Sequence, residues 1–205
     1  MKVLLGISGA SGAAYGVRTL SLLLASGADL HVLVTKTAWG ILASEVGDGK
    51  LPGGAVARRK WLARFSSSAR PFRLYAEDDF GIPFASGSNP PDAMIVAPCS
   101  MGTLARIAHG VSSSVLTRCA DVVLKERKPL VLVARETPLS TVHLENMLAL
   151  ARAGAHVLPA CPGFYHRPAT VSGLVDFVAS RALACVGVDA GVLPRWGEEE
   201  GGITR

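Results

Sequence analysis

Short apolar runs alternate with segments of helical spacing along most of the chain. The apolar runs favour strands at residues 3–7, 30–34, 72–75, 93–97, 130–134 and 156–158. The helical spacing predicts helices at residues 13–24, 38–46, 55–65, 101–109, 115–127, 140–152 and 171–186. This alternation is typical of βαβ units, so we predict an α/β fold built on a single doubly wound parallel sheet.

The length of 205 residues fits one domain. We assign residues 1–188 to this domain and residues 189–205 to a C-terminal tail, in which residues 194–196 are a candidate for a subunit contact. Residues 77–91 turn acidic and then rich in Gly, Ser and Pro, which predicts a long loop.

The longest apolar stretches fall far short of the ~18 residues that a membrane helix needs. The run that follows Lys2 is also shorter than the ~7–15 apolar residues of a secretory signal. We therefore expect a cytoplasmic protein that does not interact with a membrane.

The charge and the cysteines narrow the picture further. The net charge is +5, and residues 58–73 hold a run of basic residues without an acid. Such a run suits a solvated helix face, nucleic acid or an anionic ligand. The aromatic pattern of RNA readers is absent, which argues against nucleic acid. The four cysteines are widely spaced without a CxxC pair, so we expect buried thiols, no metal site and no disulfide framework.

Ligands of open parallel sheets bind beyond the carboxyl ends of the strands. After the first predicted strand, residues 6–12 read Gly-Ile-Ser-Gly-Ala-Ser-Gly. Small residues there let the backbone approach a ligand, and the N-terminus of the next helix offers free N–H groups to a phosphate. The spacing matches neither the dinucleotide fingerprint nor a Walker A loop. A tight turn with Ser8 or Ser11 as N-cap is the alternative interpretation.

Three later strand ends also carry polar chemistry. Residues 98–103 place two hydroxyls at a helix start, where capping alone is the alternative. Arg135 and Glu136 follow the fifth strand, and this pair suits phosphate clamping with proton exchange or a surface salt bridge. Residues 162–168 are dense in aromatics and cations, which suits an apolar phosphoester or simple packing of the loop. Thr35, after the second strand, is a weaker candidate.

Several of these segments occur together in one known family. They read GISGASGAAYG at residues 6–16, PCSMGT at 98–103, KERKPL at 125–130, RETP at 135–138 with HLENM at 143–147, and GFYH at 163–166. In order and spacing they resemble the flavin prenyltransferases, the UbiX/Pad-type proteins that supply prenylated FMN to UbiD-type decarboxylases. The resemblance runs from Lys2 to Trp196.

The resemblance implies a flavodoxin-like Rossmann fold, no metal, and transfer of the dimethylallyl group of dimethylallyl phosphate to N5 and C6 of reduced FMN. By the same resemblance the FMN contacts are Gly9, Ala10, Ser11, Thr35, Ser100, Met101, Gly102, Thr103 and Arg135. The residues that match the prenyl phosphate site are Arg118, Lys125, Tyr165 and Arg181. Glu136 matches the residue that protonates the leaving phosphate, and Ser11 and Glu45 match the pair that handles the proton released when the C6 bond forms.

One position departs from the family. Many members place a tryptophan where this chain has Phe80, a weaker π-face for a prenyl cation.

The family commonly forms dodecamers with active sites near subunit contacts, so we expect a homo-oligomer. The alternative is an FMN-dependent cysteine decarboxylase of the phosphopantothenoylcysteine type, against which the KERKPL and GFYH segments argue.

Overall fold

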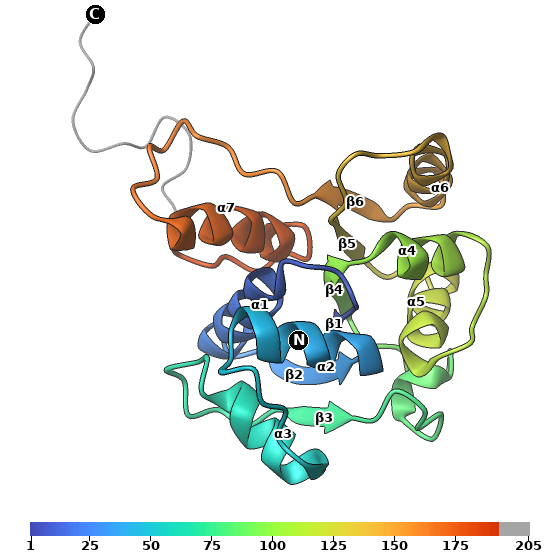
Figure 1. Cartoon of the computed structure of the whole chain (residues 1–205). Helices are drawn as coiled ribbons and strands as arrows, with labels where there is room; N and C mark the ends of the chain where they lie inside the picture. Colours follow the sequence, from blue (N-terminus) through green and yellow to red (C-terminus); the bar gives the residue numbers. More distant parts are fainter. Residues whose placement is uncertain (193–205) are drawn as a thin grey trace, which may run out of the picture.

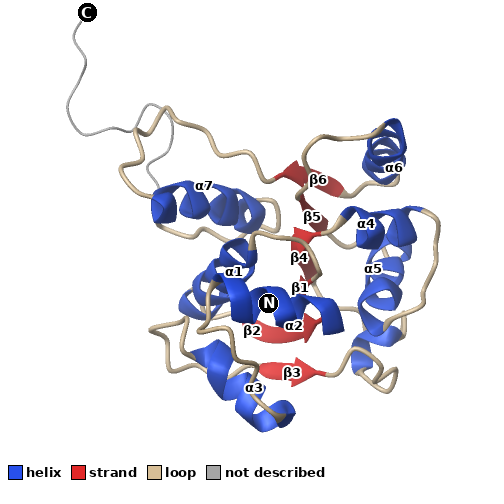
Figure 2. Ribbon diagram, viewed as in Figure 1, coloured by secondary structure: helices blue, strands red, loops and turns tan. Residues whose placement is uncertain are grey.

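Six parallel strands form one sheet in the computed structural model, which describes residues 1–192. The strands are β1 (Lys2–Ile7), β2 (Asp29–Val34), β3 (Arg73–Tyr75), β4 (Ala93–Cys99), β5 (Leu130–Ala134) and β6 (His156–Pro159). They lie in the order β3-β2-β1-β4-β5-β6, and every pair is parallel (Figure 2). The strand order reverses between β1 and β4, which defines a doubly wound Rossmann-type sheet and confirms the predicted fold class.

Helices cover both faces of the sheet, with α1 and α7 on one side and α4, α5 and α6 on the other (Figure 1). The helices are α1 (Ala13–Ala25), α2 (Lys36–Glu45), α3 (Gly54–Ala63), α4 (Met101–Ala108), α5 (Val115–Lys125), α6 (Thr141–Arg152) and α7 (Val171–Ala184). Side chains of β1 alternate between two cores, with Leu5 packed toward α1 and Leu4 toward α5. The continuous apolar character of the central strands follows from this two-sided burial.

The predicted elements agree with the observed ones to within a few residues, with two informative differences. Helix α2 begins at Lys36 because the side chain of Thr35 accepts a hydrogen bond from the N–H of Ala38 (3.2 Å) and caps it. The predicted loop at residues 77–91 contains a short 3₁₀ helix, η1 (Pro83–Ala85), whose Phe84 is buried. This loop therefore packs into the core on the α4–α6 side of the sheet.

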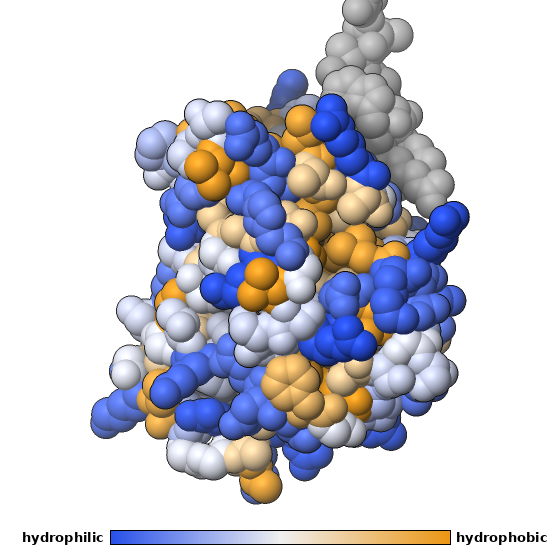
Figure 3. Space-filling model, turned by 90° about the vertical axis from the view of Figure 1, so that its right-hand side faces the viewer, coloured by the Kyte–Doolittle hydropathy of each residue, from blue (hydrophilic) through white to orange (hydrophobic). Residues whose placement is uncertain are grey.

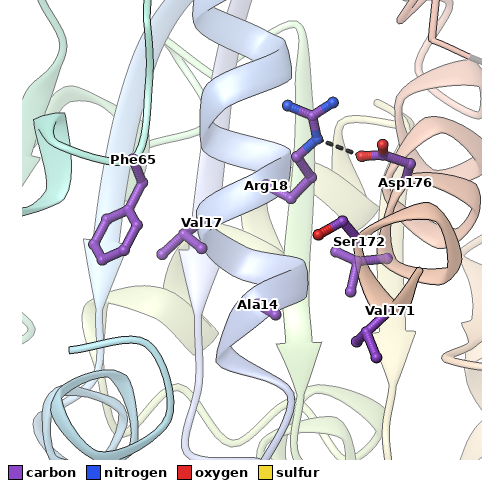
Figure 4. A pocket seen from close by; sticks show the side chains of 8 residues that line it. Ala14, Val17, Arg18, Phe65, Val171, Ser172 and Asp176 are labelled. Atoms are coloured by element: carbon purple, nitrogen blue, oxygen red, sulfur yellow. Dashed lines mark hydrogen bonds and ion pairs between the residues drawn. The ribbon is translucent and has the colours of Figure 1, made fainter.

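The parallel strands impose a direction on the helices that link them. All strands end at the same edge of the sheet, so each linking helix must run back toward the opposite edge. Helices α1 and α7 lie side by side, joined by an ion pair between Arg18 and Asp176 beside a cavity of about 440 Å³ (Figure 4). Residues in the first turn of such a helix lie near the strand ends, and residues in its last turn lie far from them.

Two further expectations concern the membrane and the C-terminal tail. No helix within residues 1–192 is both long and apolar enough to cross a membrane. The proposed contact of residues 194–196 lies outside the described part of the chain.

Two helical glycines provide a matched test of this packing. A Cβ at Gly16 of α1 would lie 2.7 Å from the carbonyl oxygen of Ala97 in β4, whereas a Cβ at Gly40 of α2 would meet nothing within 4 Å. We expect Gly16→Ala to lower the free energy of unfolding by about 1–3 kcal/mol through overcrowding. Gly40→Ala should raise it by about 0.5–1 kcal/mol through better helix propensity. Urea unfolding measures both, and stabilisation by Gly16→Ala would contradict the close approach of α1 to β4.

Candidate functional site

The turn after β1 is closed by a carboxylate from another helix. Gly12 is the N-cap of α1 and has a φ of 106°, a left-handed conformation that favours glycine. The N–H groups of Gly12 and Ala13 both donate to Oε2 of Glu45 (2.8 Å each), the last residue of α2. The expectation that this helix start offers free N–H groups to a phosphate is therefore wrong, because Glu45 occupies two of them. Neither Ser8 nor Ser11 is the N-cap.

Glu45 also forms a hydrogen bond with the side chain of Ser11. Partial burial raises the pKa of Glu45, but the hydrogen bonds from Ser11 and from the two backbone N–H groups, with the positive charge of Arg135, lower it below its ordinary value. Glu45 is thus held as a carboxylate in contact with a hydroxyl. Such a pair can accept a proton from a bound molecule and pass it on.

The loop after β4 is fastened to the loop after β1. Ser8 is buried, and its Oγ donates to the carbonyl oxygen of Pro98 (3.0 Å) and accepts from the N–H of Ser100 (2.8 Å). Ser100 caps α4 by accepting from the N–H of Thr103 (3.3 Å) and donates to its Oγ1 (3.0 Å). The segment from Ser100 to Thr103 thus lies directly across the strand-order reversal from the β1 turn.

Arg135 follows β5, and its side chain extends toward the turn after β1. Its Cγ lies 3.8 Å from where a Cβ of Gly12 would be, and its Nε is buried without a hydrogen-bond partner among the described residues. A buried, unpaired guanidinium N–H fits a bound acceptor such as a flavin carbonyl or a phosphate. Within residues 1–192 no ion pair joins Arg135 to Glu136, which is exposed and accepts from the N–H of Thr137 (3.1 Å). The alternative of a surface salt bridge is therefore wrong.

Phe80 lines a large cavity beyond the ends of β2 and β3. The cavity has a volume of about 870 Å³, and Thr37 and Trp39 of α2 also line it. A Cβ at Gly9 would lie 2.9 Å from Thr37, so the first turn and the start of α2 are in close contact. The structure thus places Phe80, which is half exposed, on a cavity that borders the β1 turn.

The four residues expected to bind the prenyl phosphate are not brought together within one chain. Arg118 lies in the first turns of α5, with its guanidinium on Asp121 (2.7 Å) and on the carbonyl oxygen of Ala85 (3.0 Å). Lys125 lies in the last turn of α5, roughly 15 Å farther along the axis than the first residue, and pairs with Glu126. It also lines a cavity beside Pro129, which precedes β5 and so lies at the opposite edge of the sheet.

The other two prenyl phosphate candidates belong to the opposite face. Tyr165 lies in the loop before α7 and packs edge-on against Phe177 and His166. Arg181 is exposed in the last turn of α7. This turn is also distant from the strand ends, because α7 runs in the same direction as α1, with the first turns of both helices lining one cavity (Figure 4). The four residues therefore do not form one pocket within this chain, because the linking helices carry Lys125 and Arg181 away from the strand ends.

Two further expectations are corrected in part. Cys99 and Cys119 are buried, and burial raises the pKa of each thiol to about 12, but Cys161 is exposed and Cys185 half-buried. In the basic run, the guanidinium of Arg58 lies 4.9 Å over the ring of Trp39, so this side chain packs on the protein. A solvated face describes its exposed neighbours Arg59 and Lys60.

A doubly wound parallel sheet whose polar loops converge where the strand order reverses defines a nucleotide-binding α/β protein. The family model described as "Flavoprotein" matches residues 1–183. A curated relative from Pseudomonas aeruginosa, named flavin prenyltransferase UbiX, is 46% identical over 199 residues, covering 97% of this chain and 95% of its own. The chain belongs to the flavoprotein family and, within it, to the UbiX-type flavin prenyltransferases.

Two solved structures agree with this assignment. AnUbiX (PadA1), in complex with FMN and dimethylallyl pyrophosphate, has a TM-score of 0.85 and 36% identity, covering 97% of this chain and 98% of its own. A dodecameric FMN-dependent UbiX-like decarboxylase from Escherichia coli O157:H7 has a TM-score of 0.82 and 39% identity, with coverage of 96% and 99%. By contrast, the FMN-dependent cysteine decarboxylase TvaF, at 19% identity and a TM-score of 0.59 over 91% of this chain and 98% of its own, shares the fold alone.

The negative charge of Glu45, which accepts hydrogen bonds at the N-terminus of α1, should stabilise the folded protein in a pH-dependent way. Because the pKa is lowered in the folded protein, the stabilisation is present above the ordinary value of 4.5 and is lost as pH falls through the lowered value. We expect Glu45→Gln to cost about 1 kcal/mol of unfolding free energy at pH 7, and the difference from the unmodified protein to shrink near pH 3. Urea unfolding at both pH values measures it, with Glu145→Gln on the surface of α6 as control. A deficit independent of pH would contradict a charged cap.

Proposed function

We propose that this protein is a flavin prenyltransferase that joins the dimethylallyl group of dimethylallyl phosphate to N5 and C6 of reduced FMN. The observation that carries the proposal is the Ser11–Glu45 pair, held on the first N–H groups of α1 and facing Arg135. A carboxylate held ionised beside a hydroxyl at a nucleotide site suits the removal of a proton from a flavin ring. Near-full-length identity to curated flavin prenyltransferases supports the same reaction.

FMN fits the loops at the strand-order reversal. Gly9, Ala10 and Ser11 would hold it from the β1 turn, where the close contact with Thr37 leaves no room for a side chain at Gly9. The segment from Ser100 to Thr103 would hold it from the β4 side, with Met101 and Gly102 at the start of α4. Thr35, which follows β2 and caps α2, would border it. The unpaired Nε of Arg135 would donate to it.

The residue types suit the two charges that the reaction develops. When bound, reduced FMN supplies the nucleophilic N5 and C6 atoms. Cleavage of the allylic C–O bond leaves negative charge on the phosphate, which Arg118, Lys125 and Arg181 would stabilise with Tyr165 and which Glu136 would protonate. The ring of Phe80 would face the positive prenyl group, an attraction worth roughly 0.5–2 kcal/mol. Glu45 would receive the C6 proton through Ser11.

We propose further that each prenyl phosphate site is completed by neighbouring subunits of a homo-oligomer, with a dodecamer as the expected form. The support is that Lys125 and Arg181 lie in last helical turns, far from the flavin loops of their own chain. Exposed apolar residues also interrupt the polar surface on the α4–α6 side (Figure 3), and those at α6 are Leu139, Val142, Leu144 and Leu148. The E. coli relative named as dodecameric supports the assembly. Residues 189–205 are assigned to a subunit contact as part of this proposal.

Product use and location complete the proposal. Prenylated FMN would pass to a UbiD-type decarboxylase, which makes that enzyme the recipient partner. A cytoplasmic location accords with four free cysteines and with the need for reduced FMN, since thiols stay reduced in that compartment.

The reaction is tested by anaerobic incubation with reduced FMN and dimethylallyl phosphate, followed by mass spectrometry of the released flavin. We expect the reduced flavin to gain the mass of one C5H8 unit. The C5H9 group replaces one hydrogen at N5, and ring closure is then neutral in mass, because the prenyl double bond takes up one proton while C6 loses one. Unchanged FMN, together with release of carbon dioxide from a cysteine derivative, would favour the cysteine decarboxylase alternative.

Shared sites predict complementation between inactive variants. Glu136→Gln and Arg181→Ala should each nearly abolish prenyl transfer. If Glu136 and Arg181 in one site come from different subunits, co-assembled mixtures of the two variants regain up to about a quarter of the activity, since that share of sites holds both native residues. The measurement is flavin prenylation by co-expressed, differently tagged variants, with the separately purified variants as control. No recovery in verified mixed oligomers would contradict shared sites.

A further inference from the structure

Ser8 links the two loops that flank the strand-order reversal. Its side chain is 1% exposed. Its Oγ donates to the carbonyl oxygen of Pro98 (3.0 Å) and accepts from the N–H of Ser100 (2.8 Å), and its own N–H also donates to Pro98 (3.2 Å). Regular pairing of β1 with β4 ends at Gly6 and Val96, so these bonds extend the connection past the end of the ladder.

This connection matters because the two loops that it joins lie far apart along the chain. Strands β1 and β4 are neighbours in the sheet, but 85 residues lie between the end of β1 at Ile7 and the start of β4 at Ala93. The only proton of the Ser8 hydroxyl is already donated to Pro98, and the side chain is buried, so Ser8 has no donor left for a ligand. Its hydroxyl can influence a ligand only through the two groups that it bonds, Pro98 and Ser100.

The position of Ser100 in turn orients the start of α4. Ser100 is bonded to the backbone and the hydroxyl of Thr103, and Arg106 reaches the same hydroxyl (3.5 Å). A displacement of the Ser100 backbone would therefore move the whole segment that is proposed to contact FMN. The partly buried N–H of Ser100 would also lose its hydrogen-bond partner if the Ser8 hydroxyl were removed, which favours such a displacement.

We propose that Ser8 is a positioning residue for flavin binding, which holds Ser100–Thr103 in the geometry that receives FMN without touching FMN itself. The inference rests on the proposed function, since it presumes that these loops bind the flavin. It assigns to the first glycine-rich turn a second task besides direct contact. The turn aligns the neighbouring loop through one hydroxyl group.

The test compares Ser8→Ala with a matched buried hydroxyl. Thr19 is fully buried in α1, and its Oγ1 has no hydrogen-bond partner among the described residues. We expect Ser8→Ala to weaken FMN binding about tenfold, the effect of one lost buried hydrogen bond, while Thr19→Val keeps the native affinity. Fluorescence titration of FMN into folded, flavin-free protein gives the dissociation constants. Ser8→Cys, which keeps a weak donor and acceptor, should fall between, and it replaces Ser8→Ala if that variant does not fold.

A purely structural Ser8 would give a different result. It would lower the melting temperature of the flavin-free protein but leave the FMN dissociation constant and the visible circular dichroism of the bound flavin unchanged, and this outcome would overturn the inference. A second variant, Thr103→Val, tests the route through α4. The losses of affinity in the double variant should be smaller than the product of the single losses, whereas independent losses would contradict that route. Failure of the unmodified protein to bind FMN would instead overturn the proposed function.

Discussion

The parallel arrangement of all six strands is the constraint on which the rest of this structure depends. It places every strand exit at one edge of the sheet and sends every linking helix back to the other. The polar loops after β1, β4 and β5 therefore meet without any special device. The same constraint carries Lys125 and Arg181 away from those loops. One rule thus brings the proposed flavin loops together within a chain, and it supports the proposal that other chains complete the phosphate site.

Two polar contacts refine what the sheet only brings close. Glu45 crosses from the end of α2 to the start of α1, where it replaces the ligand that a bare helix N-terminus would attract. Ser8 crosses from the β1 turn to the β4 turn. Each contact fixes a loop with one side chain. Neither contact involves Arg135, whose Nε lacks a hydrogen-bond partner among the described residues.

The fold was largely predictable from the sequence, because buried parallel strands appear as plain apolar runs such as residues 130–134, which match β5 without error. Capping side chains that lie next to their helix, such as Ser100, are also visible locally. The Glu45 contact was not derivable from the residues, since it joins positions 33 apart through the packing of two helices. The link from Ser8 to Ser100 spans 92 residues and likewise depends on the strand order.

The distance of Lys125 and Arg181 from the strand ends could have been predicted from the sequence. Once residues 115–127 and 171–186 are predicted as linking helices of a parallel sheet, their last turns must lie away from the strand ends. The resemblance assigns four residues to the prenyl phosphate site, namely Arg118, Lys125, Tyr165 and Arg181. It does not say which subunit supplies each of them.

The most direct test of sites shared between subunits is an experimental structure of the assembled protein with FMN and dimethylallyl phosphate bound. Shared sites predict that the cationic side chains nearest the donor phosphate include Lys125 or Arg181 from a different subunit than the Ser11 and Glu45 nearest the flavin. A donor phosphate bound only by residues of the chain that holds the flavin, or a fully active monomer, would contradict it.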